Sequence, residues 1–306
     1  MRKTFSDTIE KLAVKDKDIL FLTGDLGFNA FENLRESIGE RFINMGVAEQ
    51  NMVGVAAGLA HQGFKVFCYS IAPFIIYRCL EQFRNDVCFH KLPVFLVGNG
   101  GGYGYGIMGS SHHALEDIAC ISGLPNVTCY VPAFNDDLSP LLNEIVSAAM
   151  PAYLRLGLGK KSPAERMVIG AFTEIIKSEK PAATIIALGP LVNNILDALS
   201  NPDLKNSFDL FTLQTLPMQL HNRIIESIKS SGNLVIAEEH KSEGGIGERI
   251  SLQLHERNIR INKFVPLAAK GYPDDRYGNQ DFHQKQSGLD KESIEKVLKD
   301  FKSAAL

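Results

Sequence analysis

The feature that most restricts the fold of this chain is a regular alternation of short apolar stretches with segments of helical periodicity. Apolar stretches of strand length occur at 18–23 (DILFLT), 65–70 (KVFCYS) and 94–99 (VFLVGN), and a turn and a helical segment follow them. This order is typical of proteins in which helices connect parallel strands and cover both faces of the sheet. We therefore predict an α/β fold, with a largely parallel sheet flanked by helices.

The alternation occurs twice, and we predict two α/β domains. The first covers residues 1–160 and the second covers residues 183–306. The segment between them, 161–182, is more polar and irregular, and we interpret it as a linker with room for a short hairpin. A chain of 306 residues is long enough for about two domains of ~150 residues each.

Composition excludes several classes of protein. The formal net charge of −3 gives no basis for a surface that binds nucleic acid or anionic membranes. No apolar run reaches the ~20 residues that span a bilayer, and the N-terminal segment 1–18 lacks the apolar core of a signal peptide. The five cysteines form no C-x-x-C pair and most lie in apolar segments, as expected for reduced thiols. We predict a cytoplasmic protein that binds neither nucleic acid nor membranes.

One carboxylate stands in an unusual setting. The stretch at 45–60, MGVAEQNMVGVAAGLA, reads as a buried helix of small apolar residues, yet Glu49 lies at its start. Acids are common in a first helical turn because the helix dipole favours them there. Gly54 and Gly58, however, leave one side of the helix thin, and each costs about 1 kcal/mol relative to alanine. The glycines indicate that another helix or a ligand approaches this backbone closely.

The segment around Glu49 and several separate motifs, taken in their order along the chain, resemble the transketolase and deoxyxylulose-phosphate synthase branch of the thiamine-diphosphate enzymes. The motifs are GVAEQNMVGVAAGLA at 46–60, FIIY at 74–77, GSSHHALE at 109–116, LPNV at 124–127 with VPA at 131–133, YLR at 153–155, and AEEH at 237–240 with GGIG at 244–247. The resemblance covers nearly the whole chain. It implies a thiamine-diphosphate-binding fold, the pyrimidine-binding domain, for residues 1–160 and a fold like the transketolase C-terminal domain for residues 183–306.

The resemblance also implies the cofactor and its site. In the family a glutamate followed by small residues hydrogen-bonds N1′ of the aminopyrimidine ring, and Glu49 matches it. A carboxyl group at N1′ shifts the ring toward its imino tautomer, and burial among small apolar side chains favours the protonated carboxyl that this role requires. The cofactor carries the carbanion chemistry, while the protein supplies orientation and electrostatics. Phe74 and Tyr77 match the two aromatic residues that stack on the pyrimidine.

Three further residues have two interpretations each. His112 matches the histidine that faces the substrate in the family, or it is a structural loop histidine. Arg155 matches a strand-end arginine that contacts substrate phosphate, or it pairs with an acid at the domain junction. Asp25 stands where relatives place an acid near the cofactor or the dimer contact, or it is a turn aspartate. With the resemblance as guide, we predict His112 as catalytic and substrate-binding, Arg155 as substrate-binding and Asp25 as cofactor-binding.

The diphosphate and Mg²⁺ site of the family is not found in this sequence. Transketolases hold both groups with a Gly-Asp-Gly motif and a downstream asparagine, and GDLG at 24–27 lacks the glycine after Asp25. The resemblance therefore implies the C-terminal subunit of a split transketolase, with no metal ligands of its own. The expected partner is an N-terminal transketolase subunit that carries the diphosphate and Mg²⁺ domain. We expect an α₂β₂ assembly and no activity for this chain alone.

The glycine-rich stretch GNGGGYGYGIMG at 98–109 departs from the family pattern. Sugar-converting transketolases carry a histidine and an aspartate here that read the hydroxyl groups of the donor, and Gly100 and Met108 stand in their places. A site without such groups discriminates less among related donors. We expect a flexible, apolar stretch, and a donor or acceptor other than a standard pentose phosphate, with a modified sugar and another ketose as the open alternatives.

The resulting prediction is a transketolase subunit that transfers a two-carbon ketol unit from a ketose (phosphate) donor to an aldose acceptor. An alternative with the same Glu49 chemistry is a β subunit of a 2-oxoacid dehydrogenase, or a decarboxylating enzyme similar to deoxyxylulose-phosphate synthase. The glycine–histidine stretch at 109–113 and the LPN motif at 124–126 favour ketol transfer. A third hypothesis is a non-catalytic module that keeps the fold, and the retained Glu49 argues against it.

Overall fold

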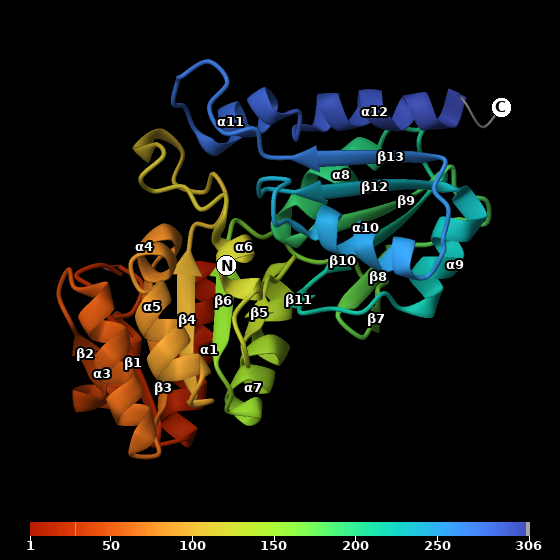
Figure 1. Cartoon of the computed structure of the whole chain (residues 1–306). Coiled ribbons are helices and arrows are strands. Elements are labelled where there is room, and N and C mark those ends of the chain that lie inside the picture. Colours follow the sequence, from red (N-terminus) through yellow and green to blue (C-terminus); the bar gives the residue numbers. More distant parts are fainter. Residues whose placement is uncertain (28, 304–306) are drawn as a thin grey trace.

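The computed structural model describes residues 1–27 and 29–303. Figure 1 shows two α/β domains, the first at the lower left and the second at the upper right. Each is built around one sheet, and most neighbouring strands in both sheets are parallel. The predicted fold class is therefore confirmed.

The first sheet has seven strands in the order β11-β5-β6-β4-β3-β1-β2. They are β1 (Ile19–Thr23), β2 (Phe42–Asn44), β3 (Lys65–Ile71), β4 (Val94–Asn99), β5 (Thr128–Tyr130), β6 (Ala152–Leu156) and β11 (Thr215–Leu216). Strands β1 to β6 pair in parallel, whereas β11 comes from the second half of the chain and pairs antiparallel with β5. The central strands are almost fully buried, as expected when helices cover both faces of a parallel sheet.

Helices from the first half of the chain form two cores, one on each face of this sheet. They are α1 (Arg2–Lys15), α2 (Glu32–Ile38), α3 (Glu49–His61), α4 (Ala72–Tyr77), α5 (Leu80–Gln82), α6 (Asp117–Ser122) and α7 (Leu138–Ala148), with a π-helical segment at Phe83–Cys88 and 3₁₀ turns at Gly39–Arg41, Gly106–Met108 and Asn135–Asp137. Side chains from α1 and α7 pack with Phe21 on one face, and side chains from α3 and α4 pack with Leu20 and Leu22 on the other. Successive strand residues point to opposite faces, so each strand serves both cores.

The second sheet has six strands in the order β13-β12-β9-β10-β8-β7. They are β7 (Met167–Ile169), β8 (Phe172–Ile176), β9 (Ala183–Leu188), β10 (Phe208–Leu213), β12 (Asn233–Glu238) and β13 (Lys263–Ala268). The helices are α8 (Val192–Leu199), α9 (Asn222–Ser231), α10 (Ile246–Glu256), α11 (Gln280–Ser287) and α12 (Lys291–Ser303), with a 3₁₀ turn at Gly189–Leu191. Apolar residues of α8 and α12 share one core with β9, β10 and β12.

The segment 161–182, predicted as a linker with room for a short hairpin, contributes two strands to the second sheet. β7 and β8 form an antiparallel hairpin, and β8 also pairs with β10. β7 has three residues, of which Met167 and Val168 are exposed, so its sequence carries too short a pattern to reveal a strand. The helical segment predicted after the apolar stretch 65–70 is also divided, into α4, α5 and the π-helical segment.

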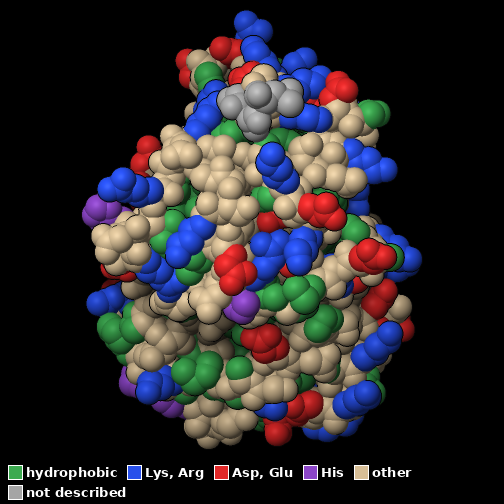
Figure 2. All heavy atoms as spheres, turned by 90° about the vertical axis from the view of Figure 1, so that its right-hand side faces the viewer, with side chains coloured by type: hydrophobic (Ala, Val, Ile, Leu, Met, Phe, Trp, Pro, Cys, Tyr) green, Lys and Arg blue, Asp and Glu red, His purple; other side chains and the backbone are tan. Residues whose placement is uncertain are grey.

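The surface shows no concentration of one charge in the view of Figure 2, where lysine and arginine side chains are interspersed with acidic ones. This agrees with the net charge of −3. Within residues 1–27 and 29–303, no helix combines the length and the apolar character needed to cross a membrane.

Candidate active site

Several of the predicted residues meet where β1, β2 and β3 end. Gly24 and Asp25 follow β1, Gly46 follows β2, and Glu49 is the first residue of α3. Phe74 lies in α4, directly after β3. Parallel strands end on the same side of a sheet, and ligands of open α/β sheets bind at that edge. The topology therefore gathers these residues at the expected position for a site.

The Glu49 carboxylate is buried and paired. Its side chain is 3% exposed. Ser70 Oγ donates a hydrogen bond to Oε1 at 3.0 Å, and Arg78 Nη1 donates one to Oε2 at 2.9 Å. Gly24 lies against the same carboxylate, since a β carbon there would be 3.8 Å from Oε1. Glu49 is thus a buried acid held by a hydroxyl and a cation, and not a solvated helix cap.

Phe74 connects this carboxylate to His112. The guanidinium carbon of Arg78 lies 4.2 Å from the centre of the Phe74 ring. The His112 ring lies 5.0 Å from the same ring at an interplanar angle of 63°, and its Nδ1 is 2.9 Å from Ser111 Oγ. The structure therefore brings together a buried carboxylate, an aromatic ring and an imidazole, which are three of the groups that the sequence analysis selected as candidates.

Tyr77 and Asp25 lie at the edge of this group. The Tyr77 hydroxyl donates to Glu116 Oε2 at 3.0 Å and accepts from Glu116 N at 3.2 Å. Burial raises the pKa of Tyr77 above its usual value, so the hydroxyl remains protonated. Asp25 is exposed and accepts a hydrogen bond from Asn44 Nδ2 at 3.2 Å. Tyr77 is thus tied to the residue before α6, and Asp25 is tied to the end of β2.

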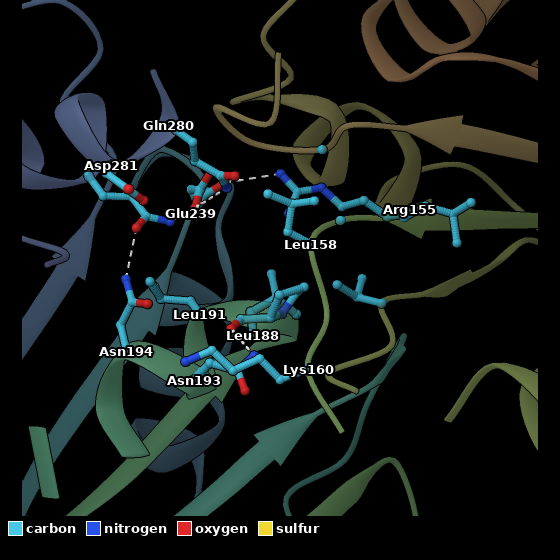
Figure 3. Close-up of a pocket in the computed structure, with 16 residues that line it drawn as sticks. Arg155, Leu158, Lys160, Leu188, Leu191, Asn193, Asn194, Glu239, Gln280 and Asp281 are labelled. Carbon is cyan, nitrogen blue, oxygen red and sulfur yellow. Dashed lines mark hydrogen bonds between the residues drawn. The ribbon is translucent and has the colours of Figure 1, made fainter. Parts of the chain in front are cut away.

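Arg155 lies at the junction of the two domains, where Figure 3 shows it pointing toward Glu239. It is 4% exposed. Its Nε donates to Asp117 Oδ2 at 2.8 Å, and its Nη2 donates to Ala114 O at 2.9 Å and to Glu239 O at 3.0 Å. Of the two interpretations made for Arg155, the structure shows the pairing with an acid at the junction. It also places Arg155 on the wall of a cavity of about 170 Å³ between the domains.

The glycine-rich stretch 98–109 differs from the expected flexible segment. A β carbon at Gly101 would lie 2.5 Å from Arg155 Nε, and one at Gly104 would lie 2.9 Å from the Gly100 Cα. Tyr103 is fully buried, and its N–H donates to Glu239 Oε1 at 2.6 Å. Glycines are thus required here because the chain packs closely on itself and on the second domain. The expectation of an apolar surface holds at the tip, where Ile107 and Met108 are exposed.

His113, next to His112, also belongs to the junction. Its Nε2 lies 2.8 Å from Gly106 O and its Nδ1 lies 2.8 Å from the Tyr272 hydroxyl. Because the Gly106 carbonyl can only accept, the Nε2–H donates to it, and the unprotonated Nδ1 accepts a hydrogen bond from the Tyr272 hydroxyl. Burial lowers the pKa of His113 to about 4, so this imidazole is neutral at pH 7. The two adjacent histidines therefore have different settings, and His112 is the one beside Phe74.

Arg78 and Ser70, the partners of Glu49, are candidate site residues that the sequence does not reveal. Charged residues at helical spacing around Arg78 favour a surface or interface ion pair. Its position four residues after Phe74 is the available signal, since residues at that spacing share one helix face. The contact with Glu49 joins two separate helical segments, and no pattern along the chain indicates it.

Comparison with known proteins identifies the two domains. Residues 1–160 match the transketolase pyrimidine-binding domain, and residues 173–294 match the transketolase C-terminal domain. The chain belongs to the transketolase family. One of the subunits of the apulose-4-phosphate transketolase of Phocaeicola vulgatus is 30% identical over 98% of this chain and 96% of its own length.

Two further members show how this transketolase-family chain relates to others. The 1-deoxy-D-xylulose-5-phosphate synthase of Clostridium perfringens is 28% identical over 96% of this chain, which spans 48% of that enzyme. A solved structure described as a split-gene transketolase in an inactive β4 tetramer superimposes with a TM-score of 0.82 at 27% identity, covering 98% of this chain and 96% of the other. These comparisons show that the chain has the transketolase fold and contains both of these domains.

Proposed function

We propose that this chain is the subunit of a thiamine-diphosphate-dependent transketolase that binds the aminopyrimidine half of the cofactor. With its partner it transfers a two-carbon ketol unit from a ketose phosphate to an aldose. The observation that carries the proposal is the buried Glu49 carboxylate beside the Phe74 ring at the end of the strands. Membership of the family is the basis for naming thiamine diphosphate as the cofactor. Glu49 and Phe74 together support the proposed location of its aminopyrimidine ring.

The residues fit an aminopyrimidine in shape and chemistry. The site offers one buried acceptor and a flat aromatic wall, and the wall already carries a flat cation, the Arg78 guanidinium. Glu49 would hold a proton at ring N1′, while Ser70 orients the other carboxylate oxygen. When bound, thiamine diphosphate supplies the carbanion chemistry that protein side chains lack. The protein's part is to hold the ring against Phe74 and to keep the Glu49 carboxyl away from water.

We assign the neighbouring residues by their position. His112 is partly exposed beside Phe74, which suits contact with the substrate and proton transfer. Tyr77 and Asp25 border the cofactor site. Arg155 remains a candidate for substrate phosphate, although three hydrogen bonds to Asp117, Ala114 and Glu239 already engage it.

A partner subunit is part of the proposal. Among residues 1–27 and 29–303, no group of three or more His, Cys, Asp or Glu side chains is arranged to hold a metal ion. We therefore assign Mg²⁺ and the diphosphate mainly to an N-terminal transketolase subunit, in an α₂β₂ complex. The similar β4 tetramer described as inactive supports a need for this partner. The free cysteines support a reducing, cytoplasmic location.

The substrate is proposed to be a sugar phosphate. The relative of Phocaeicola vulgatus is named for apulose-4-phosphate, which supports a ketose phosphate other than the standard pentose phosphates. Gly100 and Met108, in place of polar donor-reading residues, agree with such a change. A decarboxylating reaction on an oxoacid is the second candidate, because a deoxyxylulose-phosphate synthase is 28% identical over 96% of the chain.

The test is reconstitution with the partner. The chain is co-purified with a candidate N-terminal transketolase subunit from the same organism and supplied with thiamine diphosphate and Mg²⁺. We expect ketol transfer from a ketose phosphate to an aldose, and no carbon dioxide release from pyruvate. Carbon dioxide release would favour the second candidate, and a complex that binds no thiamine diphosphate would contradict the proposal.

A further inference from the structure

Arg78 occupies the place that the proposed function assigns to the aminopyrimidine ring. Its guanidinium carbon lies 4.2 Å from the centre of the Phe74 ring, and its Nη1 donates to Glu49 Oε2 at 2.9 Å. Arg78 thus bridges the aromatic wall and the carboxylate. A ring that stacks on Phe74 and hydrogen-bonds Glu49 needs the same two partners, so Arg78 and the ring compete for one place.

A guanidinium group is a close chemical substitute for a protonated aminopyrimidine. Both are flat, delocalised cations with N–H donors in their plane. Both stack on aromatic faces and pair with a carboxylate. The chain therefore carries, on its own side chain, the chemical features that the site is expected to recognise in the cofactor.

The two members of the pair differ in how firmly they are held. Glu49 is 3% exposed, and a buried carboxylate without a counter-charge is unfavourable. The Arg78 side chain is 47% exposed, and Glu49 is the hydrogen-bond partner that the structure gives its guanidinium. Arg78 can therefore turn into water at small cost, whereas Glu49 requires a cation or a proton at all times.

We infer that Arg78 is a placeholder, an exchangeable counterion that fills the pyrimidine site of the cofactor-free chain and leaves when the cofactor binds. This inference rests on the proposed function. In the free chain Arg78 neutralises Glu49 and covers Phe74. In the loaded complex the aminopyrimidine takes over both contacts, and the guanidinium turns to solvent.

The placeholder lowers the apparent affinity for the cofactor. A ligand that binds only the open form of a site has its affinity reduced by the fraction of open sites. Removal of Arg78 should therefore destabilise the free chain, which then has an unpaired buried acid, and should strengthen cofactor binding. A residue that contacts the bound cofactor would give the opposite change in affinity.

The experiment compares Arg78→Met with wild type in the complex with the partner subunit. Calorimetry gives the Kd of thiamine diphosphate with Mg²⁺, and thermal unfolding gives Tm with and without the cofactor. We expect Arg78→Met to bind the cofactor about threefold or more tightly, with a lower Tm when free and a larger rise in Tm on loading. Arg84→Met is the matched control, because Arg84 also lies over a ring, Phe89 at 4.6 Å, but outside the site.

The outcomes separate the inference from the proposed function. If Arg78→Met binds the cofactor more weakly and its rise in Tm is smaller, Arg78 contacts the loaded cofactor and the inference is wrong. If the wild-type complex binds no cofactor, both fail. Should Arg78→Met not assemble, Arg78→Lys serves instead, because an ammonium pairs with Glu49 but lacks the flat, stacking fork. We expect tighter binding than wild type, and weaker binding would overturn the inference.

Discussion

Two of the pairs that arginines form with buried acids look alike by distance and differ in construction. Glu49 and Arg78 meet at 2.9 Å at the end of the first sheet's strands, and Asp117 and Arg155 meet at 2.8 Å at the domain junction. Both acids are almost fully buried. The arginine side chain is 47% exposed in the first pair and 5% exposed in the second.

The difference teaches which pair can change partners. Arg155 also donates to two main-chain carbonyls, and Asp117 also accepts from the Tyr153 hydroxyl at 2.7 Å. Each group at the junction thus has several partners and no access to water, which makes the pair permanent. Arg78 has solvent on one side, so the pair with Glu49 can open without moving the fold. Exposure and the number of partners, and not bond length, distinguish a permanent pair from one that can open.

Replacement of Glu49 should give the largest effect on rate. In the complex with its partner and cofactor, Glu49→Gln should lower kcat by roughly 10²–10⁴-fold, because an amide cannot exchange a proton with ring N1′. The free energy of unfolding of the chain should change by less than about 1 kcal/mol, since the freed Arg78 turns to solvent. Steady-state rates and urea unfolding measure the two quantities. Glu144→Gln, at a distant acid bonded to Tyr130, is the control, and equal rates for both variants would contradict the role of Glu49.

Replacement of the arginine in the structural pair should instead affect stability. Arg155→Leu should lower the free energy of unfolding by about 3–5 kcal/mol, because it leaves Asp117 charged and buried without a cation. Urea unfolding of the purified chain measures this loss. The double variant Asp117→Leu with Arg155→Leu should recover part of it, since no unpaired charge remains. A loss below about 1 kcal/mol for Arg155→Leu would show that the pair of Asp117 and Arg155 is not permanent and resembles the pair of Glu49 and Arg78.

The contrast between the pairs also marks the limit of sequence analysis. The parallel sheets follow from apolar stretches at regular intervals, and Glu49 stands out because an acid is rare among small apolar residues. The pairing of Asp117 with Arg155 and of Glu49 with Arg78 depends on how distant segments pack, and no periodicity encodes it. For the same reason the glycines at 98–109 suggested flexibility, when their cause is contact with Arg155 and Glu239.

Short elements were beyond prediction for a different reason. β11 has two residues and joins the first sheet from the second half of the chain, so its partner cannot be found locally. Helix α11 (QDFHQKQS) is mostly polar, and it forms because Gln280 and Gln284 donate to the buried Glu239 carboxylate. In both elements tertiary contacts replace the local pattern that a sequence analysis needs.

A moderate effect is expected from pH at the junction. Burial lowers the pKa of His113 to about 4, below the ordinary value near 6.5 that the unfolded chain would show. The stability contributed by neutral His113 is therefore present above pH 6.5 and is lost as the pH falls toward 4. Between pH 7 and pH 5 this loss should be about 2 kcal/mol. Urea unfolding of wild type and His113→Gln at both pH values measures this loss. If the free energy of unfolding falls equally in the two proteins between pH 7 and pH 5, His113 is not the cause.

The smallest effect should come from a further pair, in which both side chains are exposed. Lys160 and Asp197 meet at 2.8 Å, but their side chains are 61% and 52% exposed. Water solvates both groups before and after the pair forms, so Lys160→Met should lower the free energy of unfolding by less than about 1 kcal/mol. Half-molar salt should remove even that difference, because it screens exposed charges within a few ångströms. If Lys160→Met instead lowered the free energy of unfolding as much as Arg155→Leu does, exposure would not be what separates these pairs. The argument for an exchangeable Arg78 would then lose its basis.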